Sequence, residues 1–250
     1  MAQGMSIRLP GYGQILSGPL DEARRWKVFS IICVFNNSKK LDQYLIKSLE
    51  QQTVPFELIT IDNTEGNYRA AAPVLNQAAK SARHEYLMFV HQDVALDSKD
   101  WLAGAASDMK TLDGLGAAGV AGRRPFTGLV ASVTNGVPPR YVGWRKLKKP
   151  VNVQTLDGCL MIVHKQTFSR VCFDEETVDG WYLYVTNYCL DLIRHGYKNY
   201  VLPHHIYHES SGFSDGRLYQ NAMDKIIDRH RDHVNVIYTT VGKWKTRSSR

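Results

Sequence analysis

An apolar run that ends in three polar residues is the strongest constraint on how this chain can fold. Residues 86–90 (Tyr-Leu-Met-Phe-Val) have the length and composition of a buried strand, and residues 91–93 (His-Gln-Asp) follow them directly. A second, mostly apolar run over residues 56–61 ends in Asp62. The carboxyl ends of parallel strands meet at one edge of a sheet, where α/β folds bind ligands. We therefore expect Asp62 and Asp93 at one edge, in a site for a metal-bound phosphate or a ribose hydroxyl.

Strands and helices alternate along the first half of the chain. We expect strands over residues 28–35, 56–62 and 86–91, and helices over residues 39–51, 69–82 and 99–110. Ser38 is placed to cap the first of these helices, and Asp97 or Ser98 to cap the last. This alternation predicts βαβ units and an α/β fold with parallel pairing.

The second half is less regular. We expect strands over residues 116–123, 129–134, 155–163, 198–202 and 205–208, and helices over residues 181–195 and 215–233. Gly196 is a suitable residue to end the first of these two helices. A length of 250 residues with 44% apolar residues suits one large domain.

Several protein classes are disfavoured by composition. The sequence has no apolar run of about 18 residues, so we expect no transmembrane helix, and residues 1–26 lack the apolar stretch of a secretory signal. The cysteines form no C-x-x-C pair, which argues against a zinc ribbon and favours a reduced, cytoplasmic setting; they are Cys33, Cys159, Cys172 and Cys189.

The formal net charge is +7, and much of the excess lies in residues 140–149 and 243–250. These segments are either a solvated loop and a frayed tail, or they attract an anionic partner such as a phosphate or a lipid surface. Nucleic acid is not expected as a partner, because only the net charge would support it. Peripheral contact with a membrane or another anionic surface stays open.

One glycine pattern resembles a nucleotide-binding motif. Residues 114–119 (Gly-Leu-Gly-Ala-Ala-Gly) match G-x-G-x-x-G. The dinucleotide fingerprint requires a strand before the glycines and a helix after them. Here the expected order is the reverse, with a helix before and a strand after. Tight packing of small residues in a strand is the better interpretation.

The order and spacing of several short segments together resemble GT-A fold glycosyltransferases of the family-2-like group. Within that group the chain is most similar to the branch related to streptomycin-biosynthesis glycosyltransferase-like proteins. The resemblance covers residues 27–215 and rests on residues 30–37 (SIICVFNN), 61–63 (IDN), 89–93 (FVHQD), 156–161 (LDGCLM), 173–175 (FDE) and 202–208 (LPHHIYH), and on Asn76 in an alanine-rich helix. It implies a three-layer α/β/α sandwich with a mostly parallel central sheet.

The resemblance implies a nucleotide-sugar site. The residues placed at the donor are Val34, Phe35 and Asn36 around the base, Asp62 on the base or ribose, and Asn76, His91 and Gln92. Asp62 has an alternative role as a turn cap before Asn63, and His91 as a hydrogen-bonded histidine at the sheet edge.

The resemblance also implies a divalent cation, Mn²⁺ or Mg²⁺. Asp93 falls on the last position of the family's Asp-x-Asp motif, and His208 on the place of a further metal or phosphate ligand. A helix-capping or packing role is the alternative for His208. The nearby His204 and His205 do not make a zinc site, because no suitably spaced cysteine or acidic partner accompanies them.

The catalytic base is the weakest part of the resemblance. Inverting members of the family carry acidic residues where this chain has Val185 and Asn187, neither of which can accept a proton as a base. Asp179, just before the helix, is the expected base, and Asp191 is the other nearby acid. Asp157 borders the donor sugar and the acceptor and is the second catalytic candidate.

A basic loop precedes Asp157 in the sequence. It contains Arg140, Tyr141, Trp144 and Arg145, which either close over a pyrophosphate or stack on a sugar, or form an ordinary interface.

The predicted organisation is a leader (1–26), a glycosyltransferase domain (27–215) with a nucleotide-binding half (27–98) and an acceptor half (99–215), and a C-terminal helix with a basic tail (216–250). The predicted activity is metal-assisted, inverting transfer of a sugar to a hydroxyl acceptor, in glycan or polysaccharide synthesis. One alternative is a binding module of the same fold without turnover. A nucleotidyltransferase is disfavoured, since residues 36–40 lack a glycine-rich loop.

Overall fold

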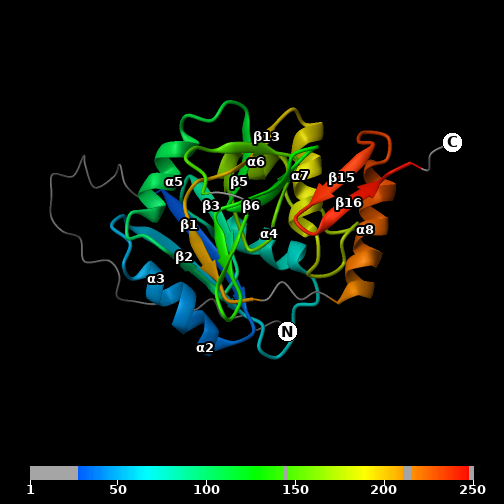
Figure 1. Cartoon of the computed structure of the whole chain (residues 1–250). Coiled ribbons are helices and arrows are strands. Elements are labelled where there is room, and N and C mark those ends of the chain that lie inside the picture. The colour runs from blue at the N-terminus through cyan, green and yellow to red at the C-terminus, as the bar shows by residue number, and fades with distance from the viewer. Residues whose placement is uncertain (1–27, 144–145, 211–214, 248–250) are drawn as a thin grey trace.

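A seven-stranded mixed sheet forms the centre of the protein (Figure 1). The computed structural model describes residues 28–143, 146–210 and 215–247. The strands in spatial order are β10 (Val151–Val153), β13 (Lys198–Val201), β5 (Leu115–Gly119), β12 (Leu160–His164), β3 (Tyr86–Val90), β1 (Phe29–Phe35) and β2 (Phe56–Asp62). β10 and β12 run antiparallel to their neighbours, and the other pairs are parallel. The predicted, mostly parallel sheet is confirmed.

Two hydrophobic cores cover the two faces of this sheet. Alternate residues of β3 point to opposite faces, so that Phe89 packs in one core and Met88 in the other. The first core receives α4 (Ala71–Ser81), α7 (Tyr184–Arg194) and α8 (Gly216–His230), and the second receives α3 (Lys47–Leu49) and α5 (Trp101–Met109). The fold is therefore the predicted three-layer α/β/α sandwich.

The helix caps differ from the prediction. The first helical segment comprises α2 (Ser38–Lys40), a π-helical stretch η1 (Leu41–Ile46) and α3. Asn37 caps it, because its side-chain oxygen accepts a hydrogen bond from the Lys40 backbone N–H at 3.1 Å. The predicted cap at Ser38 is wrong by one residue. Of the two residues predicted to cap α5, Asp97 instead forms an ion pair with His205 at 3.1 Å. Ser98, the other, accepts a hydrogen bond through its hydroxyl from the Asp100 backbone N–H at 3.2 Å, just before the helix begins at Trp101.

The glycine-rich segment is divided between two sheets. The predicted strand over residues 116–123 is broken after β5, and β6 (Ala121–Arg124) joins a three-stranded sheet with β11 (Thr155–Leu156) and β7 (Gly128–Ala131). A Cβ atom on Gly119 would lie 2.8 Å from the Leu160 carbonyl oxygen, and one on Gly122 would overlap the Thr155 carbonyl oxygen. The glycines thus allow close approach of strands, as interpreted from the sequence.

Replacing Gly122 by alanine is expected to destabilise the fold by about 1–3 kcal/mol, because the added methyl group meets backbone that cannot move aside. Urea unfolding of Gly122→Ala would measure this as a lower midpoint. Gly180→Ala is the control, since a Cβ atom there meets no other atom within 4 Å. Equal midpoints for the two variants would contradict the packing argument.

A second sheet and a C-terminal unit lie beside the central sheet. The four-stranded sheet has the order β4 (Val94–Leu96), β14 (Ile206–His208), β8 (Val133–Asn135) and β9 (Arg140–Val142). The C-terminal unit consists of α8 and a hairpin of β15 (Val236–Thr239) and β16 (Gly242–Lys245), side by side at one end of the molecule (Figure 1, orange and red).

This hairpin corrects the expectation of a frayed basic tail. The Trp244 ring of β16 packs against Tyr219 of α8, with ring centroids 5.7 Å apart. Short elements that the sequence did not predict also include β4, β10 and α6 (Lys165–Arg170). The predicted leader over residues 1–26, and Trp144 and Arg145 of the basic loop, lie outside the described residues.

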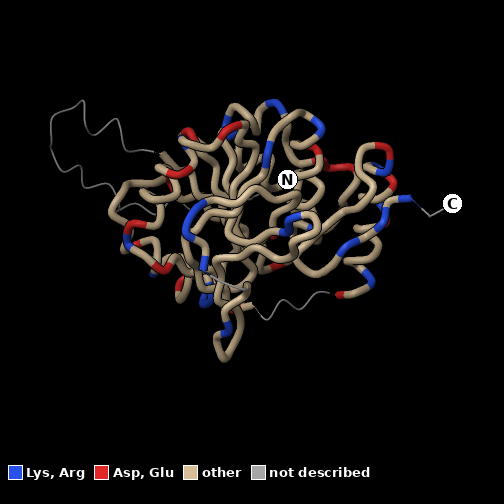
Figure 2. Tube along the Cα trace, turned by 45° about the horizontal axis from the view of Figure 1, so that its top comes forward, with Lys and Arg blue, Asp and Glu red and all other residues tan. Residues whose placement is uncertain are grey.

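The charged surface shows no large basic field. In the described part of the chain, Lys and Arg occur on several separate segments with Asp and Glu between them (Figure 2). Among the same residues, no helix combines the length and the apolar character needed to cross a bilayer.

Candidate functional site

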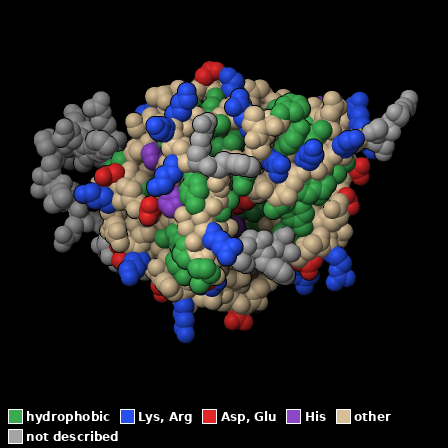
Figure 3. Space-filling view, viewed as in Figure 1, with side chains coloured by type: hydrophobic (Ala, Val, Ile, Leu, Met, Phe, Trp, Pro, Cys, Tyr) green, Lys and Arg blue, Asp and Glu red, His purple; other side chains and the backbone are tan. Residues whose placement is uncertain are grey.

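A cavity of about 470 Å³ opens at the carboxyl ends of β1 and β3. Figure 3 shows a hollow on one face of the molecule, with apolar side chains on the side of the β15–β16 hairpin. The predicted site residues that line the cavity are Val34, Phe35, Asn36, His91, Gln92, Asp93, Asp157 and His208. The structure thus brings most of the predicted site together in one place.

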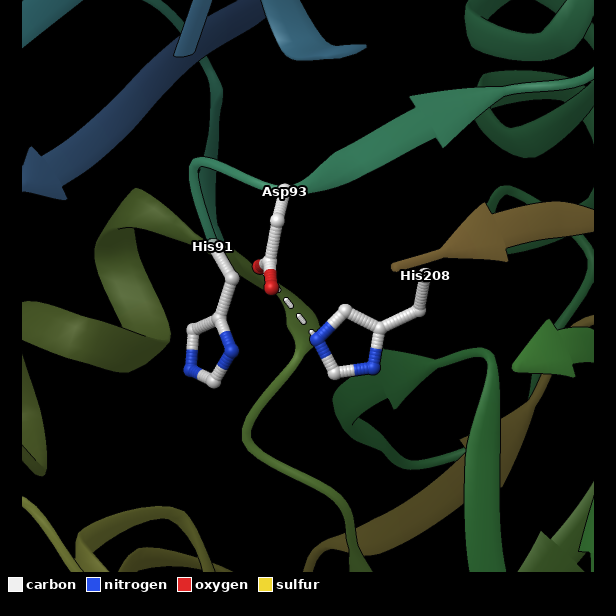
Figure 4. Close-up of side chains that lie close together, drawn as sticks. All are labelled: His91, Asp93 and His208. Carbon is white, nitrogen blue, oxygen red and sulfur yellow. Dashed lines mark ion pairs between the residues drawn. The ribbon is translucent and has the colours of Figure 1, made fainter. Parts of the chain in front are cut away.

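Three potential metal ligands converge in this cavity (Figure 4). His91 and Asp93 lie in the turn between β3 and β4, and His208 ends β14. Antiparallel pairing of β14 with β4 sets His208 opposite Val94, the residue after Asp93. One ligand atom from each of the three side chains lies within 4.8 Å of the others, and His208 Nε2 is 3.4 Å from Asp93 Oδ1.

The electrostatics of this group suit a bound cation. Burial would raise the pKa of Asp93, but the neighbouring His208 and His91 imidazoles outweigh it and hold that pKa below its usual value. His91 is open to the cavity, yet surrounding protein desolvates it, and this desolvation together with His208 lowers the pKa of His91. His208 is buried, and its Nε2 has no hydrogen-bond partner among the described residues. A carboxylate beside two imidazoles is a ligand set for a divalent cation.

Gln92 and Asn36 bind each other across the cavity edge. Gln92 Oε1 accepts hydrogen bonds from the backbone N–H groups of Asn36 (3.0 Å) and Asn37 (2.8 Å), and Gln92 Nε2 donates to Asn36 Oδ1 (2.6 Å). These bonds connect the end of β3 to the end of β1. The pair therefore shapes the cavity that was predicted to hold the nucleotide.

Asp62 adopts the alternative role considered for it. Its carboxylate is exposed and accepts hydrogen bonds from the Thr64 backbone N–H (2.8 Å) and hydroxyl (2.7 Å), which lower the pKa of Asp62. It caps the turn after β2 and does not line the cavity, whereas the next residue, Asn63, does.

Asn76 is not part of the cavity. Its side-chain nitrogen donates to the Phe173 carbonyl and to Glu175 Oε1, both at 2.8 Å, and its oxygen accepts from the Phe173 N–H at 3.1 Å. The predicted donor contact is replaced by a structural one, because both N–H groups and the oxygen of the amide bond the Phe-Asp-Glu segment and so connect α4 to it.

Asp179 does not reach the cavity either. Its exposed carboxylate forms a 2.9 Å ion pair with Lys225 of α8, and this lowers the pKa of Asp179. Asp191 pairs with Arg229 at 3.1 Å on the same helix. Asp179, the predicted base, thus contacts α8 and not the cavity.

The first turn of α7 supplies no carboxylate. Val185 lines the cavity, while Asn187 is buried between Asp174 (3.2 Å) and His230 (2.8 Å). Burial and the Arg229 charge lower the pKa of His230 to about 4, so it accepts or donates as a neutral ring at physiological pH.

Asp157 is the second carboxylate of the cavity lining. The predicted strand over residues 155–163 is interrupted between β11 and β12, and this break places Asp157 at the cavity. Its Oδ1 accepts from the Cys159 backbone N–H at 3.0 Å, and its Oδ2 accepts from the Thr240 hydroxyl at 2.8 Å. Among the described residues that line the cavity, Asp93 and Asp157 are the only acids.

Other lining residues were missed at the sequence level. They are Trp181, Leu183, Tyr219, Thr240 and Val241, together with several apolar neighbours. Leu183, just before α7, has a left-handed backbone (φ 59°), a strained conformation that is common near binding sites. Trp181 could have been predicted as a site residue, because it is an aromatic residue shortly after the Phe-Asp-Glu segment. No sequence pattern pointed to Thr240 or Val241.

Sequence comparison places the chain beside known proteins. A family profile described as "Glycosyltransferase like family" matches residues 30–211. The protein named ATP synthase subunits region ORF 6, from Fuscovulum blasticum, is 23% identical over 202 residues, which is 77% of this chain and 80% of that protein.

Solved structures share the fold. Mannosyltransferase PcManGT from Pyrobaculum calidifontis, in complex with GDP-Man and Mn²⁺, superposes with a TM-score of 0.56 at 14% identity, over 85% of this chain and 70% of that one. TarS from S. aureus, in complex with UDP-GlcNAc, gives a TM-score of 0.55 at 18% identity, over 80% of this chain and 66% of that one. The likeness extends over most of the described residues.

Proposed function

The chain belongs to the glycosyltransferase-like family, and from this premise we propose that it transfers a sugar from a nucleotide-sugar donor to a hydroxyl acceptor, with inversion at the anomeric carbon. Family membership and the GT-A fold support sugar transfer. The observation that carries the proposal is the convergence of His91, Asp93 and His208 in a cavity that also contains the end of β1.

The nucleotide half of the cavity is the carboxyl edge of β1 and β2. Val34, Phe35 and Asn36 supply an apolar wall and an amide there, with Asn63 beside them. This is the composition expected around a nucleobase, which has apolar faces and hydrogen-bonding edges. The neighbours named above were solved with GDP-Man and UDP-GlcNAc, so a nucleoside diphosphate sugar is the donor class that we propose.

His91, Asp93 and His208 would hold a divalent cation. Buried His208 fits a metal ligand, because its Nε2 makes no hydrogen bond among the described residues and faces Asp93 Oδ1 at 3.4 Å. The two imidazoles favour Mn²⁺ over Mg²⁺, which prefers oxygen ligands. When bound, the ion offsets the negative charge that develops on the leaving diphosphate. In this proposal His91 is a metal ligand as well as a residue of the donor site.

Asp157 is the base that we propose for the reaction. The acceptor hydroxyl oxygen attacks the anomeric carbon of the donor, and the bond from that carbon to the diphosphate oxygen breaks, so that the diphosphate leaves with the electron pair. The hydroxyl proton passes to the Asp157 carboxylate. Because α7 supplies no carboxylate to the cavity and Asp93 lies with the two histidines, Asp157 is the acid left for this role.

Calorimetric titration with UDP-, GDP- and dTDP-sugars, each with and without Mn²⁺, tests the proposal. We expect one donor to bind only when Mn²⁺ is present, and release of its nucleoside diphosphate when hydroxyl acceptors are added. A folded protein that binds none of these donors would contradict the proposed function.

A binding module of the same fold is the second candidate. Val185 and Asn187, which replace the family's acidic residues, favour it. It predicts Mn²⁺-dependent donor binding without release of nucleoside diphosphate. Turnover above the rate of a denatured control would exclude it.

The finer predictions remain proposals. They are the streptomycin-related branch, the two halves at residues 27–98 and 99–215, a role in glycan or polysaccharide synthesis, and cytoplasmic location with contact to an anionic surface. Because the C-terminal unit also lines the cavity, we propose that it contributes to the acceptor half.

A further inference from the structure

The C-terminal unit reaches the cavity from outside the family match. The family profile ends at residue 211. Beyond it, the cavity is lined by Tyr219 of α8, by Thr239 at the end of β15, and by the hairpin-turn residues Thr240 and Val241. A segment that lies beyond the family match thus supplies one wall of the site.

Specific bonds hold the hairpin in place. The Gln154 side chain makes two hydrogen bonds to β15. Its Nε2 donates to the Val236 carbonyl at 3.0 Å, and its Oε1 accepts from the Tyr238 backbone N–H at 2.7 Å. The Thr155 hydroxyl also donates to the Tyr238 carbonyl. Gln154 and Thr155 immediately precede Leu156 and Asp157 in the chain. The position of the hairpin turn is therefore determined by the same short segment that presents Asp157.

The hairpin turn holds the Asp157 carboxylate. The Thr240 hydroxyl donates to Oδ2 at 2.8 Å, and the Cys159 backbone N–H donates to Oδ1 at 3.0 Å. With one donor on each oxygen the carboxylate plane cannot rotate freely. Each oxygen still has a second lone pair, so the carboxylate can accept a further hydrogen bond.

We propose that Thr240 is a positioning residue for Asp157, and that the C-terminal hairpin thereby completes the acceptor side of the site. This inference rests on the proposed function, because it requires Asp157 to take the acceptor proton. Thr240 itself touches neither the proton nor the anomeric carbon. It holds the carboxylate in the orientation in which a lone pair meets the acceptor hydroxyl.

Thr240→Val tests this role, because valine keeps the shape of threonine and removes the hydroxyl. We expect kcat to fall by about 10- to 100-fold, since small misplacements of a catalytic group have effects of this size. The donor KM and the calorimetric affinity for donor with Mn²⁺ are expected to stay within about twofold, because the hairpin turn is not among the metal ligands. Thr240→Ser, which restores a hydroxyl, is expected to recover most of kcat.

Lys243→Ala is the matched control. Lys243 is an exposed residue of the same hairpin and does not line the cavity. The kcat of Lys243→Ala is therefore expected to match that of wild type. The assay is release of nucleoside diphosphate from the donor that wild type uses, with thermal unfolding to show that each variant is folded.

Different results would contradict the positioning role of Thr240 and the proposed sugar transfer. If wild type turns over a donor and Thr240→Val matches it, or if Thr240→Ser is as slow as Thr240→Val, Thr240 does not position Asp157. If folded wild type releases no nucleoside diphosphate from any donor, the proposed transfer is wrong, and this inference with it.

Discussion

Asp93→Ala is expected to abolish Mn²⁺ binding, with an affinity at least about 100-fold weaker than wild type. The carboxylate is the only acidic ligand in the group, and without it only two imidazoles remain. Loss of even an outer-shell partner typically weakens a metal site by about 10- to 100-fold, so loss of a direct ligand has a larger effect. Calorimetry or electron paramagnetic resonance of Mn²⁺ measures the change, and donor affinity is expected to fall with it.

Asp97→Ala is the control for this experiment. Asp97 also pairs with a histidine, His205, but it does not line the cavity. Its Mn²⁺ affinity is expected to equal that of wild type. Unchanged Mn²⁺ binding in Asp93→Ala, from a folded sample, would mean that His91, Asp93 and His208 do not form the metal site.

Asp157→Asn is expected to reduce kcat by about 10²- to 10⁴-fold, the usual contribution of a general base. Asparagine has nearly the same shape and its oxygen can accept one of the two existing hydrogen bonds, but it cannot take the acceptor proton. Donor and Mn²⁺ affinities are expected to persist, because Asp157 is not in the metal group. Turnover assays and calorimetry on the same preparation separate the two effects.

Asp179→Asn distinguishes the two carboxylates considered for this role. Its ion pair with Lys225 lies on the surface, and loss of an exposed pair changes stability by at most about 1 kcal/mol. We expect near wild-type turnover. If Asp179→Asn is inactive while Asp157→Asn is active, the segment before α7 would have to move so that Asp179 enters the cavity, and the assignment of the base would reverse.

The positions of strands and their polar ends could be predicted from sequence. The apolar runs before Asp62 and Asp93 correspond to β2 and β3, and their alternation with helices predicted the α/β fold. The three-layer sandwich, which the family resemblance implied, is found in the structure. Periodicity and turn residues act within a few positions of the chain, so this information is local. The family resemblance added the placement of His208, which pattern alone did not provide.

The partner of each polar side chain was less predictable. Asp179 and Asn76 are near the site in sequence, but their side chains bind Lys225 and the Phe173 backbone. Asp62 likewise bonds to its own turn. A polar side chain can cap a turn or helix, form an ion pair or bind a ligand. Which of these roles it takes depends on the groups that folding brings beside it.

Local sequence patterns were enough to predict which strands end in polar residues, and therefore Asp93 and the edge of the sheet where the site lies. The separation of β11 and β12 at Asp157, and the hydrogen bond to its carboxylate from Thr240, more than 80 residues later, became visible only in the folded chain. The physical reason is that strand formation depends on neighbours in sequence, whereas a hydrogen bond between distant segments depends on how sheets and helices pack.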